Sequence, residues 1–167
     1  MATKESLAST QTINGKRYYC IGDNKYPSVT TILGAMTDKS GIEKWRKRVG
    51  EKKADQISRF SANRGTVMHQ LNEYFLGSKK ETQRDKLIEA QQLIVPFCEE
   101  NSFTEEEMTV GRKLFFNFYN SKCFDRIASV VSIEDTLYSP VMGGYAGRVD
   151  IIYENEKGHL VILDFKS

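Results

Sequence analysis

The chain begins with a short alternating stretch and then changes to helical spacing. Residues 15–26 (GKRYYCIGDNKY) alternate between polar and apolar positions around a Gly-Asp-Asn turn, which predicts a β-hairpin. Apolar residues then recur at helical intervals in residues 29–36 (VTTILGAM). Ser28 directly precedes this run and is predicted to cap the helix through its hydroxyl group.

The next eighty residues keep helical periodicity. Apolar positions recur every three or four residues over 42–60 and again over 67–75, which predicts two helices interrupted at Gly65. A further helix is expected over residues 87–100. Residues 104–107 (TEEE) place a threonine three positions before a glutamate, the capping-box pattern that starts a helix.

From residue 128 onward the pattern changes to strands. Three segments are predicted to be extended, namely 128–139 (ASVVSIEDTLYS), 144–154 (GYAGRVDIIYE) and 159–167 (HLVILDFKS). The predicted class is therefore mixed α/β, or α+β. We expect one domain over 1–167: an N-terminal tail and hairpin (1–26), a mostly helical part (27–124) and a three-stranded core sheet (125–167).

Composition places the chain among globular proteins. Its hydrophobic content of 40% and charged content of 28% are ordinary for a soluble domain, and no apolar run reaches membrane-spanning length. The N-terminal segment lacks the apolar core of a secretory signal. Cys20, Cys98 and Cys123 lie far apart without a C-x-x-C pair, which favours a reducing compartment. We therefore expect a cytoplasmic protein with no membrane partner.

Charge is distributed unevenly along the helical part. Residues 41–66 carry eight Lys and Arg against three acidic residues, whereas residues 81–107 carry eight acidic residues against two basic ones. A basic segment of this kind is compatible with a polyanionic partner. Two helix faces exposed to solvent would give the same pattern.

The last two predicted strands can be aligned by their loop. If residues 156–158 (EKG) form a three-residue hairpin loop with glycine at its third position, Asn155 pairs with His159. Counting outward then places Asp150 directly opposite Asp164.

Two acidic side chains that face each other on half-buried strands repel. A divalent cation between Asp150 and Asp164 would remove this conflict, and Lys166, on the same face opposite Arg148, could activate water or neutralise charge on a phosphate. The alternative is a surface hairpin in which Asp164 and Lys166 form a salt bridge.

These residues resemble a known family. Asp150 followed by residues 164–166 (DFK) resembles the D…(D/E)-x-K signature of the PD-(D/E)XK nucleases, in their RecB-type branch. Residues 64–69 (RGTVMH) resemble the R-G-T-x-x-H motif of that branch. Residues 26–33 (YPSVTTIL) and 45–50 (WRKRVG) resemble the N-terminal region of tailed-phage exonucleases, which are similar to the mitochondrial genome maintenance exonuclease.

The resemblance implies a restriction-endonuclease-like αβββαβ core preceded by a helical region. It implies an Mg²⁺- or Mn²⁺-dependent exonuclease acting on DNA with single-stranded ends, in phage or cellular DNA metabolism and, for a phage protein, in the cytoplasm of the infected host. The helix and strand that follow the lysine in this family are missing after Ser167. We therefore expect a fragment, or a chain whose sheet is completed by a second chain. A catalytically incomplete DNA-binding or assembly module is the alternative function.

The resemblance also assigns roles to individual residues. The catalytic residues would be Asp150, Asp164 and Lys166; the metal ligands His69, Asp150, Asp164 and the Phe165 carbonyl; and the DNA contacts Arg64, Thr66, Arg148, Arg46 and Arg48. Glu73, four residues after His69 on the same helical face, either orients the imidazole or faces solvent. Glu134 is either a ligand through water or a charge on an edge strand, and Trp45 either stacks on a base or anchors the core.

Overall fold

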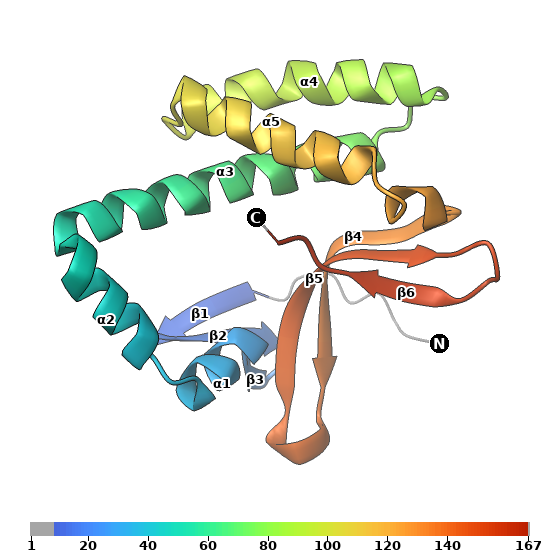
Figure 1. Ribbon diagram of the computed structural model, residues 1–167. Helices are drawn as coiled ribbons and strands as arrows, with labels where there is room; N and C mark the ends of the chain where they lie inside the picture. Colours follow the sequence, from blue (N-terminus) through green and yellow to red (C-terminus); the bar gives the residue numbers. More distant parts are fainter. Residues whose placement is uncertain (1–8, 167) are drawn as a thin grey trace.

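The described part of the chain folds into five α-helices and two separate antiparallel sheets of three strands each (Figure 1). The computed structural model describes residues 9–166. The strands are β1 (Ser9–Ile13), β2 (Lys16–Ile21), β3 (Asn24–Pro27), β4 (Ser129–Ser139), β5 (Tyr145–Glu154) and β6 (Leu160–Leu163). The helices are α1 (Val29–Met36), α2 (Ser40–Val49), α3 (Glu51–Gly77), α4 (Gln83–Glu100) and α5 (Glu105–Tyr119). The predicted mixed α/β class is confirmed.

Local sequence signals account for the N-terminal elements. The predicted hairpin is formed by β2 and β3, with Gly22 in the turn at a φ of 57°. The Ser28 hydroxyl accepts a hydrogen bond from the Thr31 N–H over 3.0 Å and caps α1, as predicted. β1 was not predicted, and it pairs antiparallel with β2 at the edge of this sheet.

The helix break expected at Gly65 lies elsewhere. α3 runs through Gly65 without interruption, and the break occurs at Gly50, whose φ of 86° favours glycine. A glycine inside a helix costs about 1 kcal/mol, whereas each fully buried side chain contributes about 1.5–3 kcal/mol. Val67, Leu71 and Phe75 are all buried on α3 just beyond Gly65, so tertiary packing outweighs the local preference.

The main core lies where α3, α4 and α5 meet the second sheet. In Figure 1, α3 lies between the pair formed by α4 and α5 and the strands β4, β5 and β6. The core consists of Val67, Met68, Leu71 and Phe75 of α3, Ala90, Ile94 and Cys98 of α4, Phe115 of α5, Ile151 and Tyr153 of β5, and Phe165. α5 begins with the predicted capping box, in which Thr104 and Glu107 each bond the other's backbone N–H. Within residues 9–166, no helix is long and apolar enough to cross a membrane.

The register of the last hairpin is as predicted, but its second strand is shorter. The Asn155 N–H donates to the His159 oxygen over 3.0 Å, and Ile151 pairs with Leu163. β6 ends at Leu163, so Asp164 and Lys166 lie outside the strand that was expected to contain them. The backbone leaves the ladder because the Phe165 ring is buried in the core and the Phe165 N–H donates to Asp150 Oδ2 over 2.5 Å.

Candidate metal centre

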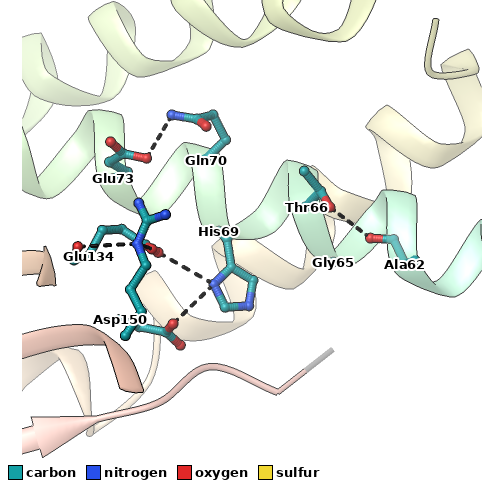
Figure 2. Close-up of a pocket in the computed structure, with 9 residues that line it drawn as sticks. Ala62, Gly65, Thr66, His69, Gln70, Glu73, Glu134 and Asp150 are labelled. Carbon is teal, nitrogen blue, oxygen red and sulfur yellow. Dashed lines mark hydrogen bonds and ion pairs between the residues drawn. The ribbon is translucent and has the colours of Figure 1, made fainter. Parts of the chain in front are cut away.

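One face of α3 opens onto the second sheet and forms a cavity of about 440 Å³ (Figure 2). The helix residues recur every three or four positions, so they share one side of α3. The lining comprises Ala62, Gly65, Thr66, His69, Gln70 and Glu73 of α3, Glu134 of β4, and Arg148 and Asp150 of β5. A helix and two consecutive strands that lie further along the chain therefore contribute to one polar cavity.

His69, Glu134 and Asp150 converge at this cavity. His69 Nδ1 lies 3.5 Å from Asp150 Oδ1 and 3.9 Å from Glu134 Oε1, and one ligand atom from each residue lies within 4.8 Å of the other two. In an octahedral site with ligands at about 2.1 Å, adjacent ligand atoms lie about 3 Å apart and opposite ones about 4.2 Å apart. The two distances from His69 Nδ1, 3.5 Å and 3.9 Å, are in this range, and no two of the three ligand atoms are more than 4.8 Å apart, so the groups enclose a space close to the size that a small divalent cation needs.

The donor set fits a hard or borderline cation. Carboxylate oxygens are preferred by Mg²⁺ and Mn²⁺, and an imidazole nitrogen is accepted more readily by Mn²⁺ than by Mg²⁺. The side chains are 32%, 19% and 12% exposed for His69, Glu134 and Asp150, respectively. Two carboxylates this poorly solvated need a compensating charge, and a bound cation would supply it.

Glu134 reaches the cluster through an unusual backbone conformation. It lies within β4 between Ile133 and Asp135, which pair with Ile151 and Val149 on either side of Asp150. Its φ of 52° is left-handed, a conformation that costs a residue other than glycine about 1–3 kcal/mol. The strand also contains a register shift between Val130 and Ser132. These irregularities are of the kind that redirects a side chain beside a functional site.

Arg148 compensates part of the negative charge. Its Nε lies 2.6 Å from Glu134 Oε2 and donates to the Glu134 backbone oxygen over 3.1 Å. Burial raises the pKa of Glu134 above its ordinary value, and the carboxylates of Asp150 and Glu73 add to the rise, while Arg148 and His69 oppose it. The centre is thus electronegative, with one guanidinium at its edge.

The segment after β6 reaches this centre through Phe165. The Phe165 N–H donates to Asp150 Oδ2, and the Phe165 ring contacts the His69 imidazole edge-on at a centroid distance of 5.7 Å. The sequence prediction concerned the Phe165 carbonyl, whereas the N–H is the group that the structure places against Asp150. Phe165 therefore orients both Asp150 and His69.

Asp164 and Lys166 lie apart from the cluster. Their side chains are 55% and 84% exposed and pair with each other. The hydrogen bond with Asp164 raises the pKa of Lys166, and Asp150 adds a smaller electrostatic contribution. Asp164 does not take part in the cluster of possible ligands found among residues 9–166.

Of the residues predicted to contact DNA, two line the cavity and three do not. Thr66 and Arg148 line the cavity. The guanidinium of Arg64 lies 5.9 Å from the centre of the Phe60 ring. Arg46 pairs with Glu51 and Asp55, and Arg48 and Trp45 are exposed and half-buried, respectively.

Two features of the site go beyond the sequence prediction. Glu134 places a carboxylate oxygen in the cluster directly, as Asp150 does, whereas the sequence predicted a water-mediated ligand or an edge charge. Gln70 lines the cavity and donates from Nε2 to Glu73 Oε2 over 2.9 Å. The helical face that contains His69 would have indicated Gln70, whereas the signal for Glu134 was the family resemblance that named it as a water-mediated ligand or an edge charge.

Comparison of the chain with protein-family models, with curated proteins and with solved structures found no match. Similarity to known proteins therefore assigns no role to any of these residues.

Proposed function

We propose that the chain is a metal-dependent nuclease that hydrolyses phosphodiester bonds in DNA. The observation that carries the proposal is the convergence of His69, Glu134 and Asp150 within 4.8 Å in an open polar cavity. A divalent cation held there would polarise a phosphate oxygen and lower the pKa of a water molecule. The cavity of about 440 Å³ leaves room for a phosphate group and water beside the three ligands.

Residues around the cluster have complementary roles in this proposal. Arg148 is 55% exposed, and its terminal nitrogens are available to a phosphate while Nε holds Glu134. Phe165 keeps Asp150 and His69 in place through its N–H and its ring. The Lys166 ammonium group would neutralise charge that develops on the phosphate, or hold the attacking water.

The choice of DNA as substrate is supported by sequence motifs. Residues 64–69 and residues 164–166 resemble nuclease motifs, and both segments contribute residues that contact the centre, namely His69 and Phe165. Exonuclease action on single-stranded ends is proposed on the same basis. The restriction-endonuclease-like core is part of this proposal as well.

A second candidate function is a DNA-binding or assembly module without catalysis. The observation that favours it is the exposed Asp164–Lys166 pair, which lies outside the cluster of ligands. Such a module would bind DNA through its basic segment, with an affinity that falls with salt and does not require a metal.

The deciding experiment measures cleavage of single-stranded DNA labelled at either end, in Mg²⁺, Mn²⁺ or EDTA. Asp150→Asn keeps an oxygen for the Phe165 N–H but weakens the metal site, and we expect it to lose at least a hundredfold in cleavage rate. Asp135→Asn is the matched control, because Asp135 is an exposed aspartate on the same strand as Glu134. Circular single-stranded DNA should resist an exonuclease.

The outcomes separate the two candidates. Metal-dependent cleavage that is lost in Asp150→Asn and His69→Ala but kept in Asp135→Asn supports the nuclease. DNA binding in EDTA with no cleavage by the wild-type chain in either metal supports the binding module. Equal cleavage by all variants would exclude this centre as the active site.

A further inference from the structure

A second hollow, of about 460 Å³, lies between the N-terminal sheet and α1. Its lining includes three cationic residues, Lys16, Arg17 and Lys39, and three hydroxyl residues, Thr12, Thr30 and Thr31. Among residues 9–166, no acidic residue lines it. The first cavity has the opposite character, because carboxylates dominate there. The two hollows are therefore suited to different parts of a ligand.

The three cations are available to a ligand. Within residues 9–166, Lys16, Arg17 and Lys39 are exposed and form no ion pair. Asp38, next to Lys39, is directed to Ser40: its two carboxylate oxygens accept from the Ser40 N–H over 2.9 Å and from the Ser40 hydroxyl over 2.7 Å. These bonds lower the pKa of Asp38, and they direct its carboxylate to Ser40.

The hollow has a defined frame. Thr12 pairs with Arg17 across β1 and β2, which places both at one position of the ladder. The Thr31 hydroxyl accepts from the Arg17 N–H over 3.1 Å and donates to the Arg17 oxygen over 3.2 Å, joining α1 to β2. Gly34 and Ala35 present almost no side chain, and a Cβ atom added at Gly34 would meet nothing within 4 Å. The space between the cations is thus open.

We infer that this hollow binds backbone phosphates of a nucleic-acid strand, at a distance from the metal centre. Cationic groups without a competing carboxylate hold phosphate oxygens without reading the base sequence. The inference rests on the proposed function in one respect only, that the strand bound here is the one cleaved at the metal centre.

The arrangement of the helices favours a polymer over a small phosphate ester. Basic residues continue from Lys39 along the next helix, where Lys44, Lys47 and Arg48 are exposed and form no ion pair within the described chain. Figure 1 shows α1, α2 and α3 following one another from the N-terminal sheet to the helix that carries the metal centre. Successive phosphates of one strand could follow this path, whereas a mononucleotide would use only the hollow.

The test measures binding of labelled single-stranded DNA in EDTA, where cleavage cannot occur, as a function of salt. Lys16→Glu/Lys39→Glu reverses two charges of the hollow, and Lys122→Glu/Lys157→Glu makes the same net change at exposed turns after α5 and between β5 and β6. We expect the first variant to lose about tenfold or more in affinity at 0.1 M salt and to lower the salt slope by about 1.4, since each phosphate contact to a single strand contributes about 0.7. The second variant should bind within about twofold of wild type.

A pair of single substitutions guards against misfolding of the charge-reversal variant. Ala35→Glu places a carboxylate in the hollow from an exposed helix position, and Ala35→Gln places an uncharged group of the same size there. We expect the glutamate to weaken DNA binding about fivefold or more relative to the glutamine, because only the glutamate repels phosphate. Equal affinities of these two variants would overturn the inference.

The remaining outcomes are also decisive. Equal losses in the two double variants, or wild-type affinity in Lys16→Glu/Lys39→Glu, would overturn the inference. So would competition by dAMP at the same phosphate concentration as the oligonucleotide, because the hollow would then bind small esters. If binding depends on the hollow but no metal supports cleavage, the inference stands and the nuclease proposal fails. If cleavage depends on Asp150 but DNA affinity is unchanged by substitutions in the hollow, the nuclease proposal stands and the inference fails.

Discussion

Arg148 and Glu134 are joined through a single nitrogen. Arg148 Nε donates to the backbone oxygen of Glu134 over 3.1 Å and lies 2.6 Å from a carboxylate oxygen of the same residue. Glu134 has a left-handed φ of 52°, so its main chain is strained at the point where Arg148 holds it. The arginine therefore stabilises both the backbone and the side-chain direction that bring this carboxylate to His69.

This relationship predicts that Arg148→Lys weakens metal binding although it keeps the charge. Lysine lacks the guanidinium Nε that contacts both the backbone oxygen and Oε2 of Glu134, so we expect the affinity for Mn²⁺ to fall about tenfold. Isothermal titration calorimetry would measure the Mn²⁺ affinity of the variant and of the wild type. Arg126→Lys, at an exposed position in the 3₁₀ turn Phe124–Arg126, is the control. An unchanged affinity in Arg148→Lys would mean that Glu134 holds its position without the arginine.

Lys166 tests the link between the exposed terminal segment and the reaction. Its side chain is 84% exposed and lies outside the cluster of ligands. If the proposed function is correct, Lys166→Ala should keep DNA binding in EDTA and Mn²⁺ affinity but lose at least about a hundredfold in cleavage, the usual effect of removing a proton-transfer group. Lys157→Ala, in the turn of the same hairpin, should cleave normally. Full cleavage by Lys166→Ala would exclude this lysine from the reaction.

Gly111 of α5 lies directly against α3. A Cβ atom there would lie 2.5 Å from Val67 Cβ and 2.9 Å from the Arg64 backbone oxygen on α3. Alanine is the better helix former by about 1 kcal/mol, but overpacking costs about 1–3 kcal/mol and the backbone of α3 cannot rotate away. We expect Gly111→Ala to lower the free energy of unfolding by up to about 2 kcal/mol in urea titrations. Gly34→Ala, in open space on α1, should raise it by about 0.5–1 kcal/mol.

Glu107 makes part of the stability dependent on pH. Burial alone would raise its pKa, but hydrogen bonds from the Thr104 N–H and from Asn63 Nδ2 outweigh burial, and the pKa lies below its ordinary value. A lowered native pKa means that the stabilising contribution is present above the unfolded value of about 4.3 and is lost as pH falls through the native value.

We therefore compare Glu107→Gln with wild type from pH 7 to pH 3. The variant should be less stable by about 1 kcal/mol at pH 7, because it lacks the charge in these hydrogen bonds, and the difference should shrink below about pH 4. Glu106→Gln, at an exposed neighbouring position, is the control and should differ little at any pH. A difference for Glu107→Gln that stays constant with pH would contradict the assigned charge.

Local elements of the fold were predictable because their causes lie within a few residues. The Ser28 cap needs only the N–H of Thr31, and the capping box needs only Thr104 and Glu107. The register of the last hairpin follows from its three-residue loop, since the side-chain period of two determines every later pair. In each case the partners are neighbours in sequence and the geometry is nearly independent of the rest of the chain.

The candidate centre was predictable only in part. His69 and Asp150 were selected from their motifs, but their approach to each other depends on the packing of α3 against the second sheet. Glu134 reaches the cluster because its own backbone is left-handed within a strand, a conformation that a glutamate does not indicate from sequence. Asp164 was expected beside Asp150, yet burial of the Phe165 ring and the bond from its N–H to Asp150 end the strand first.

The sequence by itself thus determined the caps, the turns, the mixed class and the residue types that could hold a metal. Tertiary structure decided which of those residues meet, that Gly65 stays within a helix, and where β6 ends. The physical reason is the difference in scale between the two kinds of interaction. Local preferences amount to about 1 kcal/mol each, whereas burying side chains such as Leu71 and Phe165 contributes about 1.5–3 kcal/mol per residue and overrides them.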